Sequence, residues 1–248
     1  MPDTKVFVAD ANSTDETGRV ALSFRDWLDV HLIPGGLPSV GRNAGARLAK
    51  TPYVLFIDAD IVLPDRTLLR RAVAKMERCQ LHCLTTNIWC PDGRWADHML
   101  YIGNNLFQYA SSLAMPFSTG MFMLFDKAKF DELGGFNENV HYAEDYLLSK
   151  RVSPFKFGIV AGKVHTSNRR FRKMGHARIA SMFLRTALNS WNQEYFLRDH
   201  QYWNDTGKTE EEQFAGPMLL LTSRIGTILR RTPWILKQLP TCLPPMPC

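Results

Sequence analysis

The feature that most constrains the fold is a run of five apolar and aromatic residues, 53–57, which stops abruptly at Asp58-Ala59-Asp60. A short, continuous apolar run with polar residues on both sides is typical of a strand that is buried on both faces, as in a parallel sheet. Parallel sheets belong to domains in which strands alternate with helices. The run therefore predicts an α/β domain.

The rest of the chain supports this prediction. Strands are expected at residues 5–9, 53–57, 81–89, 120–125 and 157–164, and helices at residues 17–30, 41–49, 68–79, 95–114, 127–133, 144–151 and 176–197. Because these strands and helices alternate, we predict a three-layer α/β/α domain with a mostly parallel central sheet. A length of 248 residues suits one such domain with a terminal appendage.

The composition changes near residue 204. We expect a main domain over residues 1–203, a polar linker over residues 204–215, and a basic amphipathic segment with a proline-rich tail over residues 216–248. On a helix, Leu221, Ile225 and Ile228 would share one face, and Trp234 would follow as an anchor. This pattern fits a helix over residues 216–238 that docks on an anionic membrane surface, and equally a helix packed on the main domain.

The chain has 30 Lys and Arg against 24 Asp and Glu, a formal net charge of +6. A basic protein favours anionic partners such as nucleotides, phospholipid headgroups or nucleic acid. The densest basic stretch runs from Lys150 to Arg178 and contains no acidic residue. A solvated basic face is the alternative interpretation of this stretch.

The cysteines indicate a reducing compartment. There are five of them, an odd number at low density, which does not suit a disulfide framework. Cys79, Cys83 and Cys90 lie near His82, but their spacing matches no standard zinc site, so core cysteines are expected. The first residues lack the pattern of a signal peptide, and no stretch reaches the about 18 apolar residues of a spanning helix. We expect a cytoplasmic protein, including peripheral attachment to the cytoplasmic face of a membrane.

Asp58 and Asp60 are candidate metal ligands. Strand alternation points both side chains to the same side, at the edge of the sheet where α/β proteins bind ligands. Two carboxylates held close repel each other unless a cation accompanies them, and carboxylate oxygens suit Mg²⁺ or Mn²⁺, which in turn hold phosphates. Two solvated loop aspartates, one of them capping a helix, are the alternative interpretation.

Five short motifs occur in a characteristic order. They are Val8-Ala9-Asp10-Ala11-Asn12-Ser13-Thr14-Asp15-Glu16-Thr17, Gly41-Arg42-Asn43-Ala44-Gly45, Phe56-Ile57-Asp58-Ala59-Asp60, Gly134-Gly135-Phe136-Asn137-Glu138 and Glu144-Asp145. In this order and spacing the chain resembles the family 2 glycosyltransferases, which have the nucleotide-diphospho-sugar transferase fold. The resemblance extends over about residues 6–172.

The resemblance implies a donor site and a divalent metal, Mn²⁺ or Mg²⁺. It assigns donor binding to Asp10, Arg42, Asp58, Arg169 and Arg170, and metal binding to Asp60 and His165. Each residue has a simpler interpretation: a strand-end aspartate, an exposed helix arginine, or a polar residue in a surface loop. Asp15 is expected to cap a helix rather than bind donor.

The resemblance also implies that Asp145 is the general base, supported by Glu144. Sugar transfer requires an acceptor hydroxyl to lose its proton as it attacks the anomeric carbon, and one carboxylate near the donor can take that proton. The expected outcome is direct displacement with inversion. The alternative is that the two carboxylates only favour the start of a helix, through its dipole.

The expected partners are a nucleotide-sugar donor and a glycan or lipid-linked acceptor that presents a hydroxyl or a phosphate. Two alternatives remain open. A sugar-phosphate nucleotidyltransferase would need a glycine-rich first loop with an arginine and a lysine, which this chain lacks. A nucleic-acid-binding protein would need aromatic side chains interleaved with the basic stretch, whose densest part offers only Phe171, so no nucleic acid is expected.

Members of the family normally have a further strand before the one at residues 5–9. It would lie between the strands at residues 5–9 and 53–57, and without it both would expose unpaired backbone groups. We expect the chain to lack this strand, to be incomplete at its N-terminus, and to have impaired donor binding and activity. The alternatives are that another segment, such as the tail, fills the gap, or that the sheet has rearranged to close it and leaves a weakened donor site.

Overall fold

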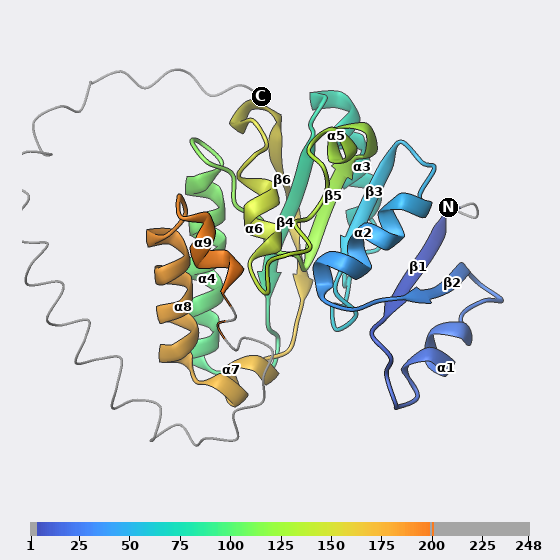
Figure 1. Ribbon diagram of the computed structural model, residues 1–248, viewed down its shortest axis with the longest axis horizontal. Helices are drawn as coiled ribbons and strands as arrows, with labels where there is room; N and C mark the ends of the chain where they lie inside the picture. The colour runs from blue at the N-terminus through green and yellow to red at the C-terminus, as the bar shows by residue number, and fades with distance from the viewer. Residues whose placement is uncertain (1–3, 199, 201–248) are drawn as a thin grey trace, which may run out of the picture. The chain divides into compact units, whose positions relative to one another are not determined.

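The computed structural model describes residues 4–198 and residue 200, and its strands form two sheets (Figure 1). In the two-stranded sheet, β1 (Lys5–Asp10) and β2 (Asp29–Pro34) run parallel. In the four-stranded sheet the strand order is β3-β5-β4-β6. Its strands are β3 (Tyr53–Ile57), β4 (Cys83–Trp89), β5 (Phe122–Asp126) and β6 (Phe157–His165).

The predicted α/β class is confirmed, and the larger sheet is mixed. Strand β5 runs antiparallel to both β3 and β4, whereas β6 runs parallel to β4. It follows that β3, β4 and β6 point in one direction and that β5 alone is reversed. The carboxyl ends of β3 and β6 therefore meet at the same edge of the sheet.

The helices agree with the predictions in the middle of the chain. They are α1 (Thr17–Leu22), α2 (Pro38–Leu48), α3 (Leu68–Cys79), α4 (Trp95–Ser111), α5 (Lys127–Glu132), α6 (Glu144–Ser149), α7 (Arg169–Met174), α8 (His176–Leu188) and α9 (Gln193–Leu197), with a 3₁₀ turn at Pro154–Lys156. The helix predicted over residues 17–30 was wrong in its second half, because residues 29–34 pair with β1 as a strand. The long helix predicted over residues 176–197 is two helices, and α7 was not predicted.

Both faces of the four-stranded sheet are covered. Along β5, Phe122 and Leu124 point into one apolar cluster, and Met123 and Phe125 point into another. The first cluster is closed by α3, α4, α7 and α8, and the second by α2, α5 and α6. This alternation along one strand is what a sheet between two helical layers requires.

The cysteines lie where core cysteines were predicted. Cys83 and Cys90 are buried free thiols, and Cys79 is partly buried, so the expectation of core cysteines is confirmed. Across the described residues, none of the helices is both long and apolar enough to cross a bilayer. The expected linker at residues 204–215 and the segment over residues 216–248, including the predicted membrane helix, lie outside the described residues.

Helix α2 is the main link between the two sheets. It packs on β1 and β2, and Gly41 approaches the strand so closely that an added Cβ would lie 2.9 Å from Cβ of Ala9. Its polar side chains reach the other way, toward β3 and α6. Among the described strands, β1 pairs only with β2, and β3 pairs only with β5.

Candidate active site

Arg42 joins three parts of the chain. Its Nη2 donates to Oδ1 of Asp58 at 2.6 Å, and its Nη1 donates to Oε1 of Glu144 at 2.5 Å. The side chain is largely buried and lies over the ring of Phe136, 5.4 Å from the ring centroid. The predicted interpretation of Arg42 as an exposed helix arginine is thereby excluded. The structure brings together the strand-end aspartates, the glycine-rich motif of α2 and the acidic start of α6.

The burial of Arg42 depends on its neighbours. Desolvation alone would lower the pKa of the guanidinium, but the carboxylates of Asp58, Glu144 and Asp145 outweigh it and raise that pKa. Gly120 faces the guanidinium, and any Cβ at this position would collide with it. The guanidinium of Arg42 therefore stays charged, and it occupies space that a side chain at position 120 would need.

Asp145 is held in one orientation by backbone donors. Its Oδ2 accepts from the N–H of Gly120 at 2.5 Å, and its Oδ1 accepts from the N–H of Tyr146 at 2.7 Å. Burial and the neighbouring Glu144 raise the pKa of Asp145 to about 7, against the opposing effect of Arg42. A carboxyl group that titrates near neutral pH can both take and return a proton.

The backbone just before this pair is strained. Ala143 has a φ of +58°, in the left-handed region that residues with a Cβ seldom adopt. Such a conformation costs on the order of 1–3 kcal/mol and is concentrated at functional sites. At this position it starts α6 so that Glu144 faces Arg42 and Asp145 faces Gly120.

Asp58 and Asp60 lie in the turn that follows β3. The N–H of Ile61 donates to the carbonyl of Asp58 at 3.2 Å, so the chain reverses around Ala59. Asp58 pairs with Arg42, whereas the half-exposed Asp60 lies 3.7 Å from Nη2 of Arg169. The two aspartates thus meet cations from two different helices, α2 and α7.

His165 is the last residue of β6 and lies beside the same turn. Its backbone exchanges two hydrogen bonds of 2.8 Å with Val62, two residues beyond Asp60. Its Nε2 is buried and has no hydrogen-bond partner among residues 4–198 and 200, an unfavourable state for an imidazole nitrogen unless a ligand satisfies it. In the part of the chain that the structure describes, no three His, Cys, Asp or Glu side chains are grouped closely enough to hold a metal ion. The donor chemistry of Asp60 and His165 fits a divalent cation.

The remaining predicted residues are less closely connected. The carboxylate of Asp10 accepts from the N–H and the hydroxyl of Ser13, so its described hydrogen bonds stay within its own loop. Asp15 accepts from the N–H and the hydroxyl of Thr17, but the N-cap of α1 is Glu16 and no described side chain caps this helix, so the expected cap by Asp15 is not formed. Arg169 and Arg170 are the first two residues of α7.

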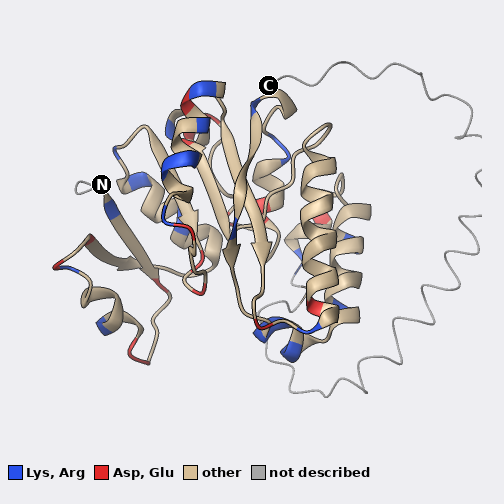
Figure 2. Cartoon of the chain, turned by 180° about the vertical axis from the view of Figure 1, so that it is seen from behind, with Lys and Arg blue, Asp and Glu red and all other residues tan. Residues whose placement is uncertain are grey.

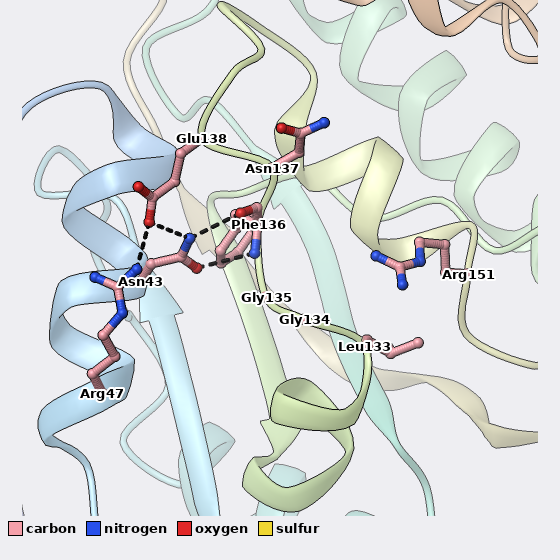
Figure 3. Close-up of a pocket in the computed structure, with 9 residues that line it drawn as sticks. All are labelled: Asn43, Arg47, Leu133, Gly134, Gly135, Phe136, Asn137, Glu138 and Arg151. Atoms are coloured by element: carbon pink, nitrogen blue, oxygen red, sulfur yellow. Dashed lines mark hydrogen bonds and ion pairs between the residues drawn. The ribbon is translucent and has the colours of Figure 1, made fainter.

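Asn43 forms a second link, which the sequence did not predict. Its Oδ1 accepts from the N–H of Phe136 at 3.0 Å, and its Nδ2 donates to the carbonyl of Phe136 and to Glu138, both at 2.8 Å (Figure 3). Arg47 also donates to Glu138, at 2.7 Å. These hydrogen bonds connect the turn at Gly134-Gly135 and the residues after it to α2. Nothing in the local sequence of Asn43 signals a partner 93 residues away.

A pocket of about 430 Å³ lies beside this link. It is lined by Asn43, Arg47, Leu133, Gly134, Gly135, Phe136, Asn137, Glu138 and Arg151 (Figure 3). Its lining contains none of Asp58, Asp60, Asp145 and His165, so the pocket is separate from the candidate active site. We assign it no part in the chemistry.

Asp97 is a buried carboxylate without a sequence signal. It accepts from Asn168 Nδ2 at 3.0 Å and contacts His176 Nε2 at 2.6 Å, which ties α4 to both ends of α7. Burial alone would raise its pKa, but the hydrogen bonds from Asn168 and His176 lower it overall. The group positions α7, which carries Arg169 and Arg170.

The sequence of this chain matches a known protein family. The sequence model of glycosyl transferase family 2 matches residues 1–134, more than half of the chain. The chain belongs to this family. The membership confirms the resemblance and favours a nucleotide-sugar glycosyltransferase over the nucleotidyltransferase and the nucleic-acid-binding protein. A comparison with curated protein sequences finds no match.

Solved structures share the fold. The mannosyltransferase PcManGT from Pyrobaculum calidifontis, in complex with GDP-Man and Mn²⁺, is 20% identical with a TM-score of 0.52, over 73% of this chain and 55% of that one. Glucosyl-3-phosphoglycerate synthase from Mycobacterium tuberculosis, in complex with phosphoglyceric acid, is 15% identical with a TM-score of 0.50, over 74% and 69%. S. aureus TarS is 18% identical with a TM-score of 0.50, over 76% and 36%. The chain spans only about half the length of the first structures it matches.

Proposed function

We propose that the protein transfers a sugar, with inversion, from a nucleotide-diphospho-sugar to a hydroxyl or phosphate of an acceptor. The observation that carries this proposal is the Arg42 network. One buried cation joins the strand-end Asp58, expected at the donor, to Glu144, the neighbour of the expected base. Membership of glycosyl transferase family 2 supports the proposal that donor and base would meet at this polar cluster.

The chemical step needs one base and one leaving group. Asp145, as a carboxylate, takes the proton of an acceptor hydroxyl. The oxygen forms a bond to the anomeric carbon from the face opposite the nucleoside diphosphate, and the bond between that carbon and the diphosphate oxygen breaks. The configuration at the anomeric carbon inverts, the proton remains on Asp145, and the electron pair leaves with the nucleoside diphosphate. Hydrogen bonds from Gly120 and Tyr146 orient the carboxylate for this role.

The donor side needs positive charge for the diphosphate. Arg169 and Arg170 at the start of α7 would contribute it, and Arg169 already lies near Asp60. Asp60 and the unpartnered Nε2 of His165 would hold Mn²⁺ or Mg²⁺, which supplies positive charge to the leaving group when bound. Two neighbours in fold support this assignment, since PcManGT was solved with GDP-Man and Mn²⁺ and glucosyl-3-phosphoglycerate synthase with UDP-Glc and Mn²⁺. Asp10 would receive hydrogen bonds from the base of the nucleotide.

Calorimetric titration of the full chain with nucleotide-sugars, with and without Mn²⁺, tests the donor site. A donor whose free concentration is 100 times its dissociation constant should raise the free energy of unfolding by about 2.7 kcal/mol. Asp60→Ala should remove the Mn²⁺-dependent part of the affinity without unfolding the protein. Asp92→Ala, in the exposed turn after β4, is the matched control and should bind as the wild type does. Unchanged Mn²⁺-dependent binding by Asp60→Ala would contradict the assignment.

A further inference from the structure

An exposed apolar stripe runs along the whole of α4. Its members recur at helical spacing on one face: Trp95, Met99, Ile102, Leu106 and Leu113, the last just past the end of the helix. The opposite face is the buried one, with Asp97, Tyr101 and Gln108. A stripe of this length, about 25 Å, is not the scattered exposure that surfaces normally show. No charged side chain interrupts it, since the only acidic or basic residue of α4 is the buried Asp97.

Helix α8 extends the apolar surface. It packs beside α4, and its exposed apolar residues are Phe183, Leu184 and Leu188, followed by the exposed Trp191. In Figure 2 the ribbons of both helices are almost entirely tan, whereas blue positions gather on the short helix α7 at their end. That helix carries Arg169, Arg170, Arg172 and Lys173.

The exposed charges on the three helices are positive, and exposed carboxylates such as Asp60, Asp92 and Glu194 lie outside these helices. Helices α7 and α8 contain no acidic residue, and the single one of α4 is buried. Two copies of the chain meeting through these helices would bring their basic side chains together, and the helices themselves offer no exposed carboxylate to offset them. An anionic lipid surface would instead receive the apolar stripe and neutralise the basic helix, as amphipathic interfacial helices do.

We propose that the face formed by α4, α7 and α8 docks on an anionic membrane surface. The apolar side chains enter the boundary between headgroups and acyl chains, with Trp95 and Trp191 as amphipathic anchors, and α7 meets the headgroup charge. Arg169 of α7 also lies beside Asp60, so docking brings the candidate active site to the lipid surface. Together with the proposed transferase function, on which this last step rests, the geometry favours an acceptor carried in the membrane.

The test is co-sedimentation of the full chain with vesicles of phosphatidylcholine, and with vesicles of equal parts phosphatidylcholine and phosphatidylglycerol. Binding should require the anionic lipid and weaken as salt is raised. Leu106→Glu with Leu113→Glu, at positions that are 64% and 85% exposed, should weaken the apparent affinity on the order of tenfold or more, since two apolar contacts are lost. Phe155→Glu, 91% exposed in the 3₁₀ turn before β6, is the matched control and should bind as the wild type does.

Several outcomes would overturn the proposal. They are equal sedimentation of the double variant and the wild type, no binding of the wild type to anionic vesicles, and a wild-type dimer in light scattering that the double variant turns into a monomer. If the double variant does not melt cooperatively, Leu188→Glu on α8 takes its place with the same expectation. Donor binding measured by calorimetry does not depend on vesicles, so failure of the transferase proposal remains distinguishable from failure of membrane docking.

Discussion

The two sheets of the protein differ in how much they bury. The four-stranded sheet lies between two apolar clusters that include Leu84, Phe122 and Phe125, each almost completely buried. In the two-stranded region, α1 has no buried residue and Val30 is the only buried residue of β1 and β2. Val20, Phe24, Trp27, Leu28 and Leu32 are exposed there.

The difference indicates which region contributes most to stability and which candidate site residues lie in it. Asp58, Asp145 and His165 stand on or next to the well-packed sheet, whereas Asp10 stands on the poorly packed one. The two regions are held together largely through α2, by the polar links of Arg42 and Asn43. We therefore expect the region around the four-stranded sheet to be rigid and the two-stranded region to depend on a few hydrogen bonds.

The largest effect should come from Asp145→Asn in the well-packed region. It preserves shape and removes the base, so turnover should fall by roughly 10²–10⁴-fold while donor affinity changes little. Because burial and Glu144 raise the pKa of Asp145 to about 7, and the carboxylate form is the base, wild-type kcat/KM should rise with pH through about 7 and then level off. Steady-state kinetics and donor titration measure both.

Asp131→Asn, on the exposed side of α5, is the control and should leave turnover unchanged. If Asp145→Asn retains turnover, or loses donor binding as well, the base lies elsewhere and the division of roles between the two regions fails.

A matched pair of phenylalanines tests the packing difference itself. Phe125→Ala in β5, at a side chain with 0% exposure, should lower the free energy of unfolding by about 3–5 kcal/mol, because it removes apolar contacts and leaves a cavity. Phe24→Ala after α1, at a side chain with 53% exposure, should change it by about 0.5 kcal/mol or less. Denaturant unfolding measures both variants. Similar losses would mean that the two-stranded region is as well packed as the other.

The link between the regions should have a smaller effect on stability than the buried Phe125. Asn43→Ala leaves the N–H and carbonyl of Phe136 without their partner, and should cost about 1–3 kcal/mol. Arg47→Ala removes only an exposed pair with Glu138 and should cost about 1 kcal/mol or less. Thermal melts distinguish them. If Asn43→Ala costs no more than Arg47→Ala, the link does not hold the regions together.

The sequence by itself determined the elements with strong local patterns. Helix α3 and the strand at residues 53–57 were predicted at their observed bounds, because amphipathic spacing and an uninterrupted apolar run are local properties. The expectation that this strand is buried on both faces and parallel to its neighbour was wrong, since β3 lies at the end of the four-stranded sheet, pairs antiparallel with β5, and has Phe56 as its one buried residue. The order of the five motifs was enough to predict the family. The strand at residues 29–34 was missed because its apolar residues are interrupted by His31 and its partner β1 lies 24 residues earlier in register.

The tertiary structure alone decided which polar groups meet. Arg42 contacts Asp58 and Glu144, 16 and 102 residues away, and Asn43 holds Phe136 across 93 residues. It also decided the reversal of β5, which depends on the path of residues 112–121 rather than on hydropathy. Hydrogen bonds and ion pairs act over a few ångströms, so a residue's role depends on what folding brings beside it, and a local pattern records only its own neighbours along the chain.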